Sequence, residues 1–503
     1  AIHDDPESLL LCNGFKDGSF IRHALAGRKL GKQVVIVIEK LEEYFNAMKI
    51  ANELQVEPLF GVRLRLRSQG AGRWATSGGQ NAKFGLTTSE LVRMSDDLKR
   101  RGLGHCLQLV HFHIGSQISD VATLKRAVCE ATRYFAKLVQ AGHDVRYLDV
   151  GGGLGVDYLG SRSTSESSMN YTLDEYARDV VYNIQQVCGD EEVAPPVIVS
   201  ESGRAIVAHH SVLVVEAFGA ISRRENIEFG EVGADDAQVV RDLHDILDSL
   251  SRKQRRENLH DAMHLREQAE DLFSYGMLGL EDKAKAEAIF WRICGRTLDL
   301  FGRARNVPGE IRELQVAFAD KLLCNFSVFQ SLLDHWALDQ MFPVVPLEGL
   351  LERSEGRSTI VDITCDSDGK IDKFVADGDW SPTMPATLAD GQSRADIGIF
   401  LIGAYQDIMG DFHNLFGRNT EVHVFLDEDE DSGYYVEEVI QGSRIEDVLA
   451  MTQWDRKFLV RSFKRQVDGA IRDDRLKPKH AMRLLKDFED GLDSFTYLVF
   501  EDD

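Results

Sequence analysis

Residues 148–158 have the sequence Leu-Asp-Val-Gly-Gly-Gly-Leu-Gly-Val-Asp-Tyr, which decides how the first half of the chain is interpreted. The apolar start predicts a short buried strand, and Gly151, Gly152 and Gly153 follow at its end. Three glycines in a row lack Cβ atoms, so their backbone N–H groups can converge on an anion such as phosphate. The same three glycines fit a tight turn equally well. The pattern fits neither G-x-G-x-x-G nor G-x-x-x-x-G-K-[ST], which argues against a dinucleotide or ATP site.

Short β-rich runs alternate with amphipathic helical segments through the first 220 residues. Repeated β-then-α units of this size predict a parallel sheet, either closed into a (β/α) barrel or doubly wound. Functional groups follow strand ends at His113, at the glycine run and at Glu201, where a barrel places its active site, so we favour the barrel. The predicted strands are residues 9–13, 34–38, 61–67, 107–113, 147–150 and 197–200, and the predicted helices are residues 20–30, 41–54, a segment from 89, 121–141 and 173–187.

The pattern changes twice beyond residue 230. Residues 234–305 have only helical periodicity, which predicts a helical bundle inserted between two larger domains. Strands return in the following segment and indicate a mostly antiparallel β domain, with predicted strands at residues 315–319, 358–364, 397–402, 421–426 and 434–440. The acidic run at 427–431 favours a solvated hairpin loop over a metal site. The expected domains are residues 1–230, 234–305, 309–440 and a helical region at 445–503.

The composition excludes several classes of partner. The chain has 58 Lys plus Arg against 82 Asp plus Glu, a net charge of −24, which argues against binding to nucleic acid or to an anionic membrane. No apolar run approaches the ~20 residues of a membrane helix. The seven cysteines are scattered and form no C-x-x-C pair, which indicates reduced thiols in a cytoplasmic protein.

Two histidines, His111 and His113, lie near the end of the predicted strand 107–113. A histidine in this position is often a satisfied core residue. The two share one face of the strand and could bind a metal, although no third ligand of matching spacing is nearby. In a third interpretation, an imidazole beside the small residues Gly115 and Ser116 stacks on a flat cofactor.

Two further clusters follow predicted strands. In Glu201-Ser202-Gly203-Arg204, the carboxylate could hold a ring nitrogen protonated and the arginine could neutralise a phosphate, or the two could form a surface ion pair. The second cluster is Cys365-Asp366-Ser367-Asp368-Gly369, which is either a functional segment or an ordinary turn. Neighbouring acids raise the pKa of a thiol and do not activate it, whereas an acid there suits the cationic end of a substrate.

Together these segments resemble one family, the alanine-racemase-like (fold type III) pyridoxal-phosphate decarboxylases, and within it the bacterial biosynthetic arginine decarboxylases. The resemblance runs from about residue 10 to the C-terminus. It is also carried by Leu11-Cys12-Asn13-Gly14-Phe15-Lys16-Asp17, Ser77-Gly78-Gly79 with Lys83-Phe84-Gly85, Cys324-Asn325-Phe326-Ser327 with Phe329-Gln330-Ser331, and Gly403-Ala404-Tyr405-Gln406. The single motifs are shared across the fold type, whereas their combination with the helical insert is specific.

The resemblance implies a cofactor, pyridoxal 5'-phosphate, and a role for individual residues. His113 is expected to stack on the pyridine ring, Glu201 to keep its nitrogen protonated, and Cys365 to protonate the carbanion left by CO2. The expected phosphate ligands are Gly151, Gly152, Gly153, Arg204 and Tyr405, with support from Ser116. The expected substrate contacts are Asp320, Asp366 and the segment Leu148, Asp149, Val150, Gly151, Gly152, Gly153, Leu154, Gly155, Val156, Asp157 and Tyr158.

The implied reaction is decarboxylation of L-arginine to agmatine and CO2, which feeds polyamine synthesis. The resemblance also implies a homodimer or larger oligomer, with Cys365 and Asp366 acting across the subunit interface. Decarboxylation of another diamino acid, ornithine or diaminopimelate, is the alternative within the fold type, and a non-catalytic regulatory homologue is the alternative outside it. Similar enzymes carry Mg2+, but the sequence shows no ligand set for this ion.

One feature of the family is missing. The cofactor is expected to form a Schiff base with a lysine in a Lys-Val-Asn-type motif, and no such motif occurs here. The early lysines match other parts of the family; they are Lys16, Lys29, Lys32 and Lys40. Because the sequence also begins Ala-Ile-His, without an initiator Met, we expect a fragment that starts after the first barrel strands and is inactive by itself. A catalytically dead homologue is the alternative.

Overall fold

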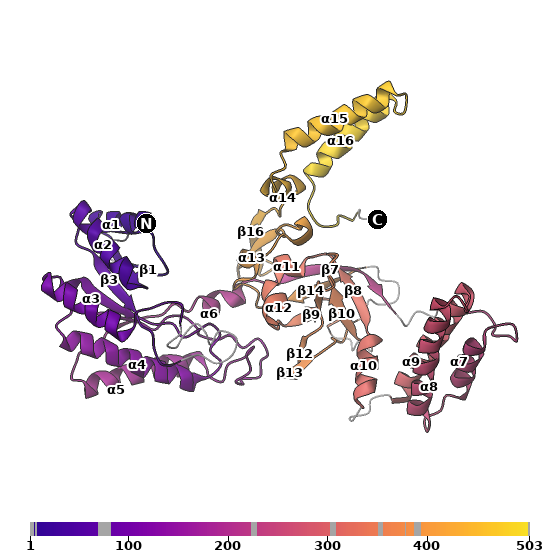
Figure 1. The fold of residues 1–503 in the computed structure, drawn as a ribbon, viewed down its shortest axis with the longest axis horizontal. Coiled ribbons are helices and arrows are strands. Elements are labelled where there is room, and N and C mark those ends of the chain that lie inside the picture. The colour runs from indigo at the N-terminus through magenta and orange to yellow at the C-terminus, as the bar shows by residue number, and fades with distance from the viewer. Residues whose placement is uncertain are drawn as a thin grey trace.

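The computed structural model describes residues 5, 8–68, 82–222, 229–301, 308–350, 356–377, 379–386 and 394–500. Figure 1 shows an elongated arrangement, with an α/β lobe at the N-terminal end, a β lobe in the centre and helical lobes beyond it. The Ser77-Gly78-Gly79 motif lies outside the described residues.

The N-terminal lobe is built on one six-stranded sheet. Its strands pair in chain order and in parallel: β1 (Leu9–Cys12), β2 (Gln33–Ile38), β3 (Leu59–Arg63), β4 (Leu107–His111), β5 (Tyr147–Asp149) and β6 (Val197–Val199). They are connected by α1 (Gly18–Lys29), α2 (Leu41–Leu54), α3 (Thr88–Arg100), α4 (Val121–Gln140) and α5 (Leu173–Asp190). A doubly wound sheet reverses its strand order, and this sheet does not. The predicted barrel class is therefore confirmed, as a curled half-barrel.

Strand β2 shows why the first sheet has an almost continuous apolar sequence. Residues 34–38 are all at most 2% exposed. Ile36 and Ile38 pack in the large cluster that includes Tyr44 of α2, whereas Val35 and Val37 pack with Leu109 of β4 in a separate cluster. Alternate side chains thus enter different cores, as expected for a parallel strand that is covered on both faces.

Local capping fixes where three of the covering helices begin. Asp17 precedes α1, and its carboxylate accepts a hydrogen bond of 2.7 Å from the N–H of Phe20. Capping boxes formed by a threonine and a glutamate start α3 and α5, through Thr87 with Glu90 and Thr172 with Glu175. These sequence signals explain why the predicted helix starts lie within two residues of the observed ones.

The central lobe is built on a second, mixed sheet. Its strand order is β11 (Lys370–Ile371), β10 (Ser358–Val361), β8 (Asp320–Cys324), β7 (Leu213–Ile221), β14 (Ala395–Ile399) and β9 (Val344–Pro346). Only β8 and β10 pair in parallel within this sheet, and the other four pairings are antiparallel. The lobe also holds β12 (Phe374–Ala376), β13 (Asp379–Ser381), α11 (Val328–Ser331), α12 (Leu333–Leu338) and α13 (Gln406–Met409). The predicted mostly antiparallel β domain is confirmed.

Two expectations for this region were wrong in detail. The strand predicted at residues 315–319 is largely the helix α10 (Gly309–Ala317), and the strand begins at Asp320. A short apolar run fits either structure, so its periodicity could not decide. The expected first domain, residues 1–230, also contains β7, which pairs with β8 and β14 of the second sheet. Strand pairing is non-local, and the sequence shows no break before Leu213.

Three helices form the bundle at one end of the molecule: α7 (Gln238–Ser249), α8 (Arg255–Ser274) and α9 (Leu280–Phe301). They enclose their own apolar cluster, which includes Leu243 and Ile289 (Figure 1). The predicted helical bundle is therefore present. The chain ends in α14 (Ile445–Met451), α15 (Arg456–Arg472) and α16 (Pro478–Leu492). None of the described helices is both long and apolar enough to cross a membrane.

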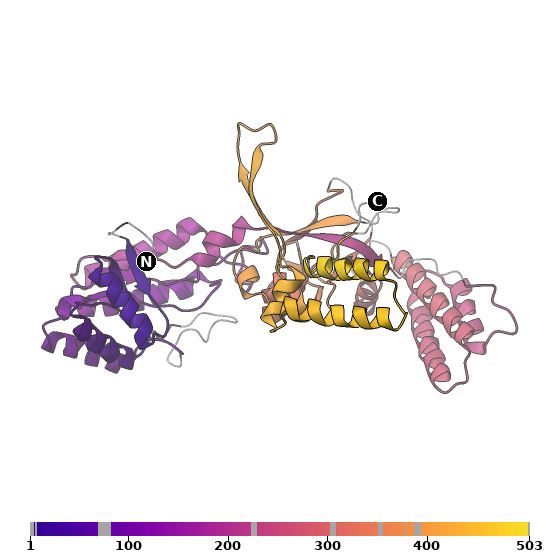
Figure 2. The same ribbon diagram turned by 90° about the horizontal axis from the view of Figure 1, so that it is seen from above.

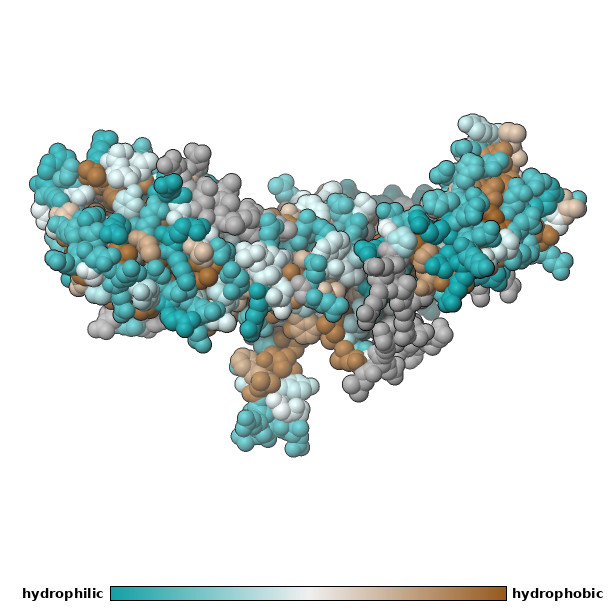
Figure 3. All heavy atoms as spheres, turned by 90° about the horizontal axis from the view of Figure 1, so that it is seen from below, coloured by the Kyte–Doolittle hydropathy of each residue, from teal (hydrophilic) through white to brown (hydrophobic). Residues whose placement is uncertain are grey.

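A hairpin of β15 (Glu421–Leu426) and β16 (Tyr434–Ile440) projects from the central lobe (Figure 2). Figure 3 shows apolar residues along this hairpin and hydrophilic residues at its tip. The tip contains the acidic run at 427–431, most of which is exposed. The solvated hairpin loop predicted from the sequence is thus observed.

The packing of β2 gives a first prediction. Ile36 is fully buried in the core of the half-barrel, so Ile36→Ala removes packed methyl groups and is expected to destabilise this lobe by roughly 2–5 kcal/mol. Hydrogen exchange followed by mass spectrometry should show faster exchange of peptides from β2 and β3. Leu30, 81% exposed at the end of α1, supplies the control. Unchanged exchange in Ile36→Ala, or an equal effect of Leu30→Ala, would contradict the assigned core.

Candidate active site

Polar side chains gather at the carboxyl edge of the half-barrel. Asn13 follows β1, His111 ends β4 and is followed by His113, Asp149 ends β5, and Glu201 follows β6. Parallel pairing brings these strand ends to one edge of the sheet, although the residues span almost 190 positions of the chain. This is the edge at which (β/α) barrels hold their active sites.

The glycine run packs against neighbouring backbone. Gly151 and Gly153 have φ angles of +67° and +105°, and a Cβ on either would overlap the carbonyl oxygens of Phe112 and Gly115 respectively. A Cβ on Gly152 would lie 2.8 Å from the carbonyl oxygen of Glu201. Any side chain here would also fill the space beside the ring of His113, because Cε1 of that ring would be 3.6 Å from the added Cβ. The glycines therefore let the backbone at the end of β5 approach the segments that follow β4 and β6 closely.

Arg204 contacts two of the other residues predicted for the phosphate site, Ser116 and Tyr405. Its guanidinium is buried and donates hydrogen bonds to the Ser116 hydroxyl at 3.2 and 3.3 Å and to the Tyr158 hydroxyl at 3.0 Å. Its Cζ atom lies 4.6 Å from the centre of the Tyr405 ring. Arg204 is the second residue of the short helix α6 (Gly203–Val207), and Tyr405 precedes α13 in the central lobe. The site therefore lies where the two lobes meet.

Glu201 has different partners from Arg204. The Asn13 amide donates a hydrogen bond to Oε1 of Glu201. Behind it, the buried side chains of His111 and Asp149 are in contact, with Nδ1 of His111 2.9 Å from Oδ2 of Asp149. The sequence left open a surface ion pair between Glu201 and Arg204. In the structure the two side chains have other partners.

The pKa values of the two carboxylates in this group, Glu201 and Asp149, shift in opposite directions. Desolvation by the surrounding chain raises the pKa of Glu201. The charge of His111 acts to lower this pKa, and the nearby Asp149 acts to raise it. For Asp149, burial also acts to raise the pKa, but the contact with His111 outweighs it and the net pKa is lowered. Asp149 is therefore the carboxylate that carries the negative charge most readily, with His111 as its partner.

His113 is held as a neutral ring. Burial, together with the positive charges of Arg63 and His111, lowers the pKa of His113 to about 4. At neutral pH the imidazole is therefore uncharged and flat, which suits stacking on an aromatic ring. Among the described residues, His111 shares a group of possible metal ligands with Asp149 and Glu201, and His113 is not part of it. The structure therefore does not support a metal site that uses both His111 and His113.

The predicted thiol and its neighbour lie on a separate loop. Cys365 is exposed after β10, and its N–H donates to Oδ1 of Asn414 at 3.1 Å. Oδ2 of Asp366 lies 3.7 Å from Nε2 of His413. These contacts stay within the central lobe, so the described chain does not itself place Cys365 against His113. Their action across a subunit interface stays a prediction.

Asp320 does not join this group either. It starts β8 and pairs with Ser358 at the start of β10, whereas Cys365 follows the other end of β10. The two residues therefore lie at opposite ends of these strands. Oδ1 of Asp320 is buried without a hydrogen-bond partner among the described residues. A contact of Asp320 with substrate stays a prediction.

The segment 148–158 divides into different roles. Leu148, Val150 and Leu154 are buried in the core of the half-barrel, and Val156 and Tyr158 are buried in the core of the central lobe. Asp157 accepts hydrogen bonds from the Ser168 hydroxyl at 2.7 Å and from the N–H of Arg162 at 3.0 Å, while the N–H of Gly155 donates to the Tyr171 hydroxyl at 3.1 Å. Most of these side chains are therefore held inside the protein, and substrate contact by the whole segment stays a prediction.

The early lysines have other tasks. The buried Lys16 donates to the carbonyl oxygens of Gly14 and Val37, and its Nζ lies 3.3 Å from Oε2 of Glu43. Nζ of Lys29 donates to the carbonyl oxygen of Leu54 at 3.1 Å. Nζ of Lys40 lies over the ring of Phe15, 5.5 Å from its centre. These contacts support the sequence-based conclusion that these lysines do not match the family's Schiff-base position.

Sequence reasoning assigned no role to Asn13 and did not predict the contact of His111 with Asp149 behind Glu201. Asn13 is the last residue of the predicted strand 9–13, as His113 is of the strand 107–113, so the same strand-end rule could have selected it. The pairing of His111 with Asp149 depends on the register of β4 and β5, which places these residues opposite each other. No local pattern in the sequence signals this contact.

The described residues contain two groups that could hold a metal: His111 with Asp149 and Glu201, and Glu57 with His105 and Cys106. Mg2+ prefers oxygen ligands in octahedral geometry, and each group includes a histidine. Neither supports the Mg2+ expected from the resemblance.

The fold and the site define a pyridoxal-dependent decarboxylase. Residues 1–208 match the model of the pyridoxal binding domain of pyridoxal-dependent decarboxylases, residues 233–315 that of the arginine decarboxylase helical bundle domain, and residues 445–498 that of the arginine decarboxylase C-terminal helical extension. The chain is 41% identical to the biosynthetic arginine decarboxylase of Phocaeicola vulgatus and 43% identical to that of Deinococcus radiodurans. Each alignment covers 99% of this chain, and 79% and 75% of the relative. The chain therefore belongs to the family of biosynthetic arginine decarboxylases.

Solved structures agree with this assignment. The crystal structure of the biosynthetic arginine decarboxylase SpeA from Campylobacter jejuni matches with a TM-score of 0.84 and 29% identity, over 98% of this chain and 79% of that one. Diaminopimelate decarboxylase from Helicobacter pylori matches with a TM-score of 0.55 and 17% identity, over 89% and 79%, and shows the shared fold.

The site residues fit pyridoxal phosphate. The glycine run lets the backbone pack closely where a Cβ would clash, and Ser116, Arg204 and Tyr405 meet nearby. Backbone N–H groups, a hydroxyl and a guanidinium are the donors that a phosphate requires. His113 offers an uncharged ring, and Glu201 a carboxylate within the same group of strand ends.

The lowered pKa of His113 predicts a pH effect. The folded pKa is about 4 and the unfolded value is 6.5, so between these values the unfolded chain binds a proton that the folded chain does not. Stability should therefore fall as the pH falls from 6.5 to 4, and His113→Gln should lessen that fall. NMR of protein labelled at the histidine ring carbons should show His113 neutral at pH 5.5, with the signal assigned by its loss in His113→Gln. A protonated His113 at pH 5.5 would contradict the assignment.

Proposed function

We propose that this protein catalyses the pyridoxal-phosphate-dependent decarboxylation of L-arginine to agmatine and CO2 and supplies agmatine for polyamine synthesis. The observation that carries the proposal is the meeting of Ser116, Arg204 and Tyr405 beside the glycine run. This occurs in a chain that aligns over 99% of its length with biosynthetic arginine decarboxylases. The matched helical bundle at residues 233–315 favours arginine over ornithine and diaminopimelate as the substrate.

Each site residue has a task that follows from its contacts. When bound, the cofactor supplies an electron-accepting ring for the electrons released as CO2 leaves. Arg204, Ser116, Tyr405 and the N–H groups of Gly152 and Gly153 bind the phosphate, whereas the N–H of Gly151 donates to Oδ1 of Asp149 at 2.8 Å. His113 presents its flat, neutral ring to orient the pyridine. Glu201 stabilises a proton on the pyridine nitrogen, and the amide of Asn13 fixes the position of its carboxylate.

The remaining assignments rest on the family resemblance. Cys365 donates a proton to the substrate carbon, and Asp366 binds the cationic end of arginine, both from a second subunit of a homodimer or larger oligomer. The exposed position of Cys365 on a loop of the central lobe supports this arrangement. We also propose that the half-barrel domain ends before β7, and that the protein is cytoplasmic, since all seven of its cysteines are free thiols.

The reaction is tested with protein produced from its complete gene and saturated with pyridoxal phosphate. We expect CO2 and agmatine to be released from L-arginine in equal amounts, and kcat/KM for ornithine and for diaminopimelate to be at least about 100-fold lower. A hundredfold preference corresponds to about 2.7 kcal/mol, which unpaired polar groups in a specific site readily supply. Absence of CO2 release from arginine, or a preference for either other amino acid, would refute the proposal.

The role of Glu201 is tested by Glu201→Gln in the same protein. The amide keeps the shape but lacks the charge, so the pyridine nitrogen loses its proton more readily. We expect kcat to fall by about 100-fold or more, as for the loss of roughly 3 kcal/mol of a charge-assisted hydrogen bond in the transition state. Cofactor affinity should change less, because the phosphate is bound separately. Glu192→Gln, at an exposed position before β6, is the control, and a kcat of Glu201→Gln within about threefold of the unchanged protein would exclude the assignment.

The 503-residue chain by itself is expected to be inactive, because it contains no Lys-Val-Asn motif and Lys16 is already bonded. Incubation with pyridoxal phosphate and borohydride, followed by peptide mass spectrometry, should find no lysine of this chain that carries the cofactor in stoichiometric amount. Stoichiometric labelling of one lysine, together with agmatine production by this chain, would show that the Schiff-base lysine lies within the 503 residues.

A further inference from the structure

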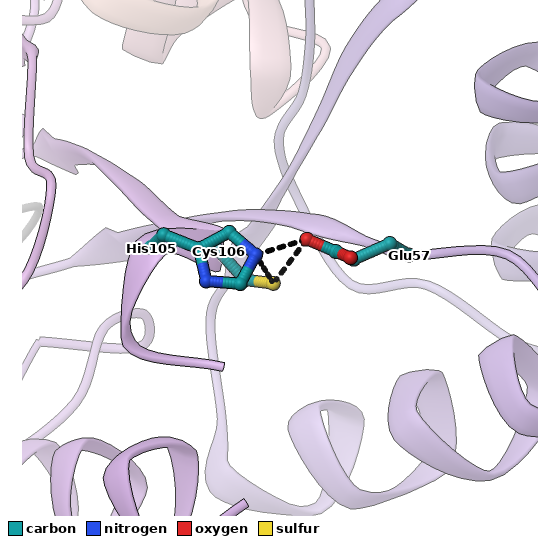
Figure 4. Close-up of side chains that lie close together, drawn as sticks. All are labelled: Glu57, His105 and Cys106. Atoms are coloured by element: carbon teal, nitrogen blue, oxygen red, sulfur yellow. Dashed lines mark hydrogen bonds and ion pairs between the residues drawn. The ribbon is translucent and has the colours of Figure 1, made fainter. Parts of the chain in front are cut away.

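Three metal-binding side chains meet at the edge of the half-barrel opposite the candidate active site. Figure 4 shows that Glu57, His105 and Cys106 point toward one another. Nε2 of His105 contacts Oε1 of Glu57, and the Cys106 sulfur lies 3.5 Å from the same oxygen and 3.8 Å from the same nitrogen. The decarboxylase site uses residues that follow the strands, so this group has no part in it.

The fold holds these three residues directly before two paired strands. Glu57 lies two residues before β3, and His105 and Cys106 belong to the 3-10 turn that leads directly into β4 (Leu107–His111). The parallel register pairs Phe60 of β3 with Leu107 of β4, so the residues before these strands are neighbours. Because the two strands are buried in the sheet, the positions of the donors do not depend on a loose loop.

The spacing of the donor atoms fits one tetrahedral ion. Zn–S and Zn–N bonds of about 2.3 and 2.05 Å at a tetrahedral angle separate sulfur from nitrogen by about 3.6 Å, and a carboxylate oxygen is at a similar distance from the sulfur. The observed separations of 3.8 and 3.5 Å agree with these values. The close contact between His105 and Glu57 would open by about 1 Å as the ion replaces their shared proton. Glu57 and His105 are both about half exposed, so their side chains can make this movement.

The charges around the group also suit a cation. Hydrogen bonding from His105 lowers the pKa of Glu57, so this carboxylate is ionised at neutral pH. Burial, followed by the negative charge of Glu57, raises the pKa of Cys106 to about 12, so the thiol keeps its proton until a cation replaces it. The Arg28 guanidinium is the opposing charge nearby, and it donates to the carbonyl oxygen of Lys32. Asp144 lies on the other side, joined through the amide of Gln108 to the backbone of His105.

We propose that Glu57, His105 and Cys106 form a site for a divalent transition-metal ion, with Zn2+ as the best match. A thiolate, an imidazole and a carboxylate are the ligand types that Zn2+ takes, whereas Mg2+ and Ca2+ take oxygen ligands. Three protein ligands leave the fourth position to a water molecule, since Glu57 and His105 are open to solvent. The ion ties the starts of β3 and β4 together at the amino edge of the sheet, remote from the decarboxylation chemistry. An ordinary ion pair beside a buried thiol is the competing interpretation.

The site is tested on the untagged 503-residue chain without added cofactor. After removal of metals, the protein is incubated with Zn2+, desalted and measured for zinc by mass spectrometry. We expect one Zn2+ per chain, and substitution by Co2+ should give a thiolate-to-cobalt charge-transfer band in the near ultraviolet. His105→Gln, at an exposed position, should weaken Zn2+ binding in a chelator competition by at least about 100-fold, because even changes to outer-shell partners cost about 10- to 100-fold.

Matched variants distinguish this site from other thiols and imidazoles. Cys106→Ser should abolish the charge-transfer band, whereas Cys129→Ser and His23→Gln, which change a cysteine and a histidine elsewhere in the half-barrel, should leave both measurements unchanged. If Cys106→Ser does not fold, the band is followed in His105→Gln and Glu57→Gln, which alter exposed side chains. Zinc retention that is unchanged in His105→Gln, or a cobalt complex without the thiolate band, would overturn the proposal.

Discussion

The parallel pairing of β1 to β6 in chain order is the constraint on which both described sites depend. It carries every carboxyl end of these strands to one edge of the sheet and every amino end to the other. Asn13, His113, the glycine run and Glu201 meet at the first edge because they follow strands. Glu57 and Cys106 meet at the second because they precede strands. A shift in the register of β3 against β4 would separate the second group completely.

At the carboxyl edge, close backbone approach matters more than any single side chain. The glycines at 151–153 lie where the segments that follow β4 and β6 leave no space for a Cβ. This approach brings backbone donors beside the neutral ring of His113, and Arg204 then joins Ser116 of the half-barrel to Tyr405 of the central lobe. The phosphate of a bound cofactor would thus link the two lobes as well as hold the cofactor. Binding and the relative position of the lobes are expected to be coupled for this reason.

The sequence predicted what local patterns encode. The helix at residues 41–54 and the hairpin strands at 421–426 and 434–440 agree with the structure to the residue, and the strand-end rule selected His113 and Glu201. The sequence did not predict that β7 joins the second sheet, because strand pairing is non-local. It also did not predict that the apolar run before Asp320 is mostly helix, because so short a run fits a strand equally well. The contacts of Asn13 with Glu201 and of Glu57 with His105 join residues 188 and 48 positions apart, and only strand register brings them together. Cys365 lies on a loop whose expected target is in another subunit, so neither the sequence nor one chain could place it.

The central claim is that the carboxyl edge of the half-barrel binds the phosphate of pyridoxal phosphate. Calorimetric titration of protein from the complete gene with pyridoxal phosphate and with pyridoxal, which lacks the phosphate, measures this most directly. We expect pyridoxal to bind at least about 100-fold more weakly, since the phosphate accepts charge-assisted hydrogen bonds of about 1.5–3 kcal/mol each. Arg204→Ala should remove most of that difference. Equal affinities for the two compounds, or a difference that Arg204→Ala leaves intact, would contradict the assignment of the site.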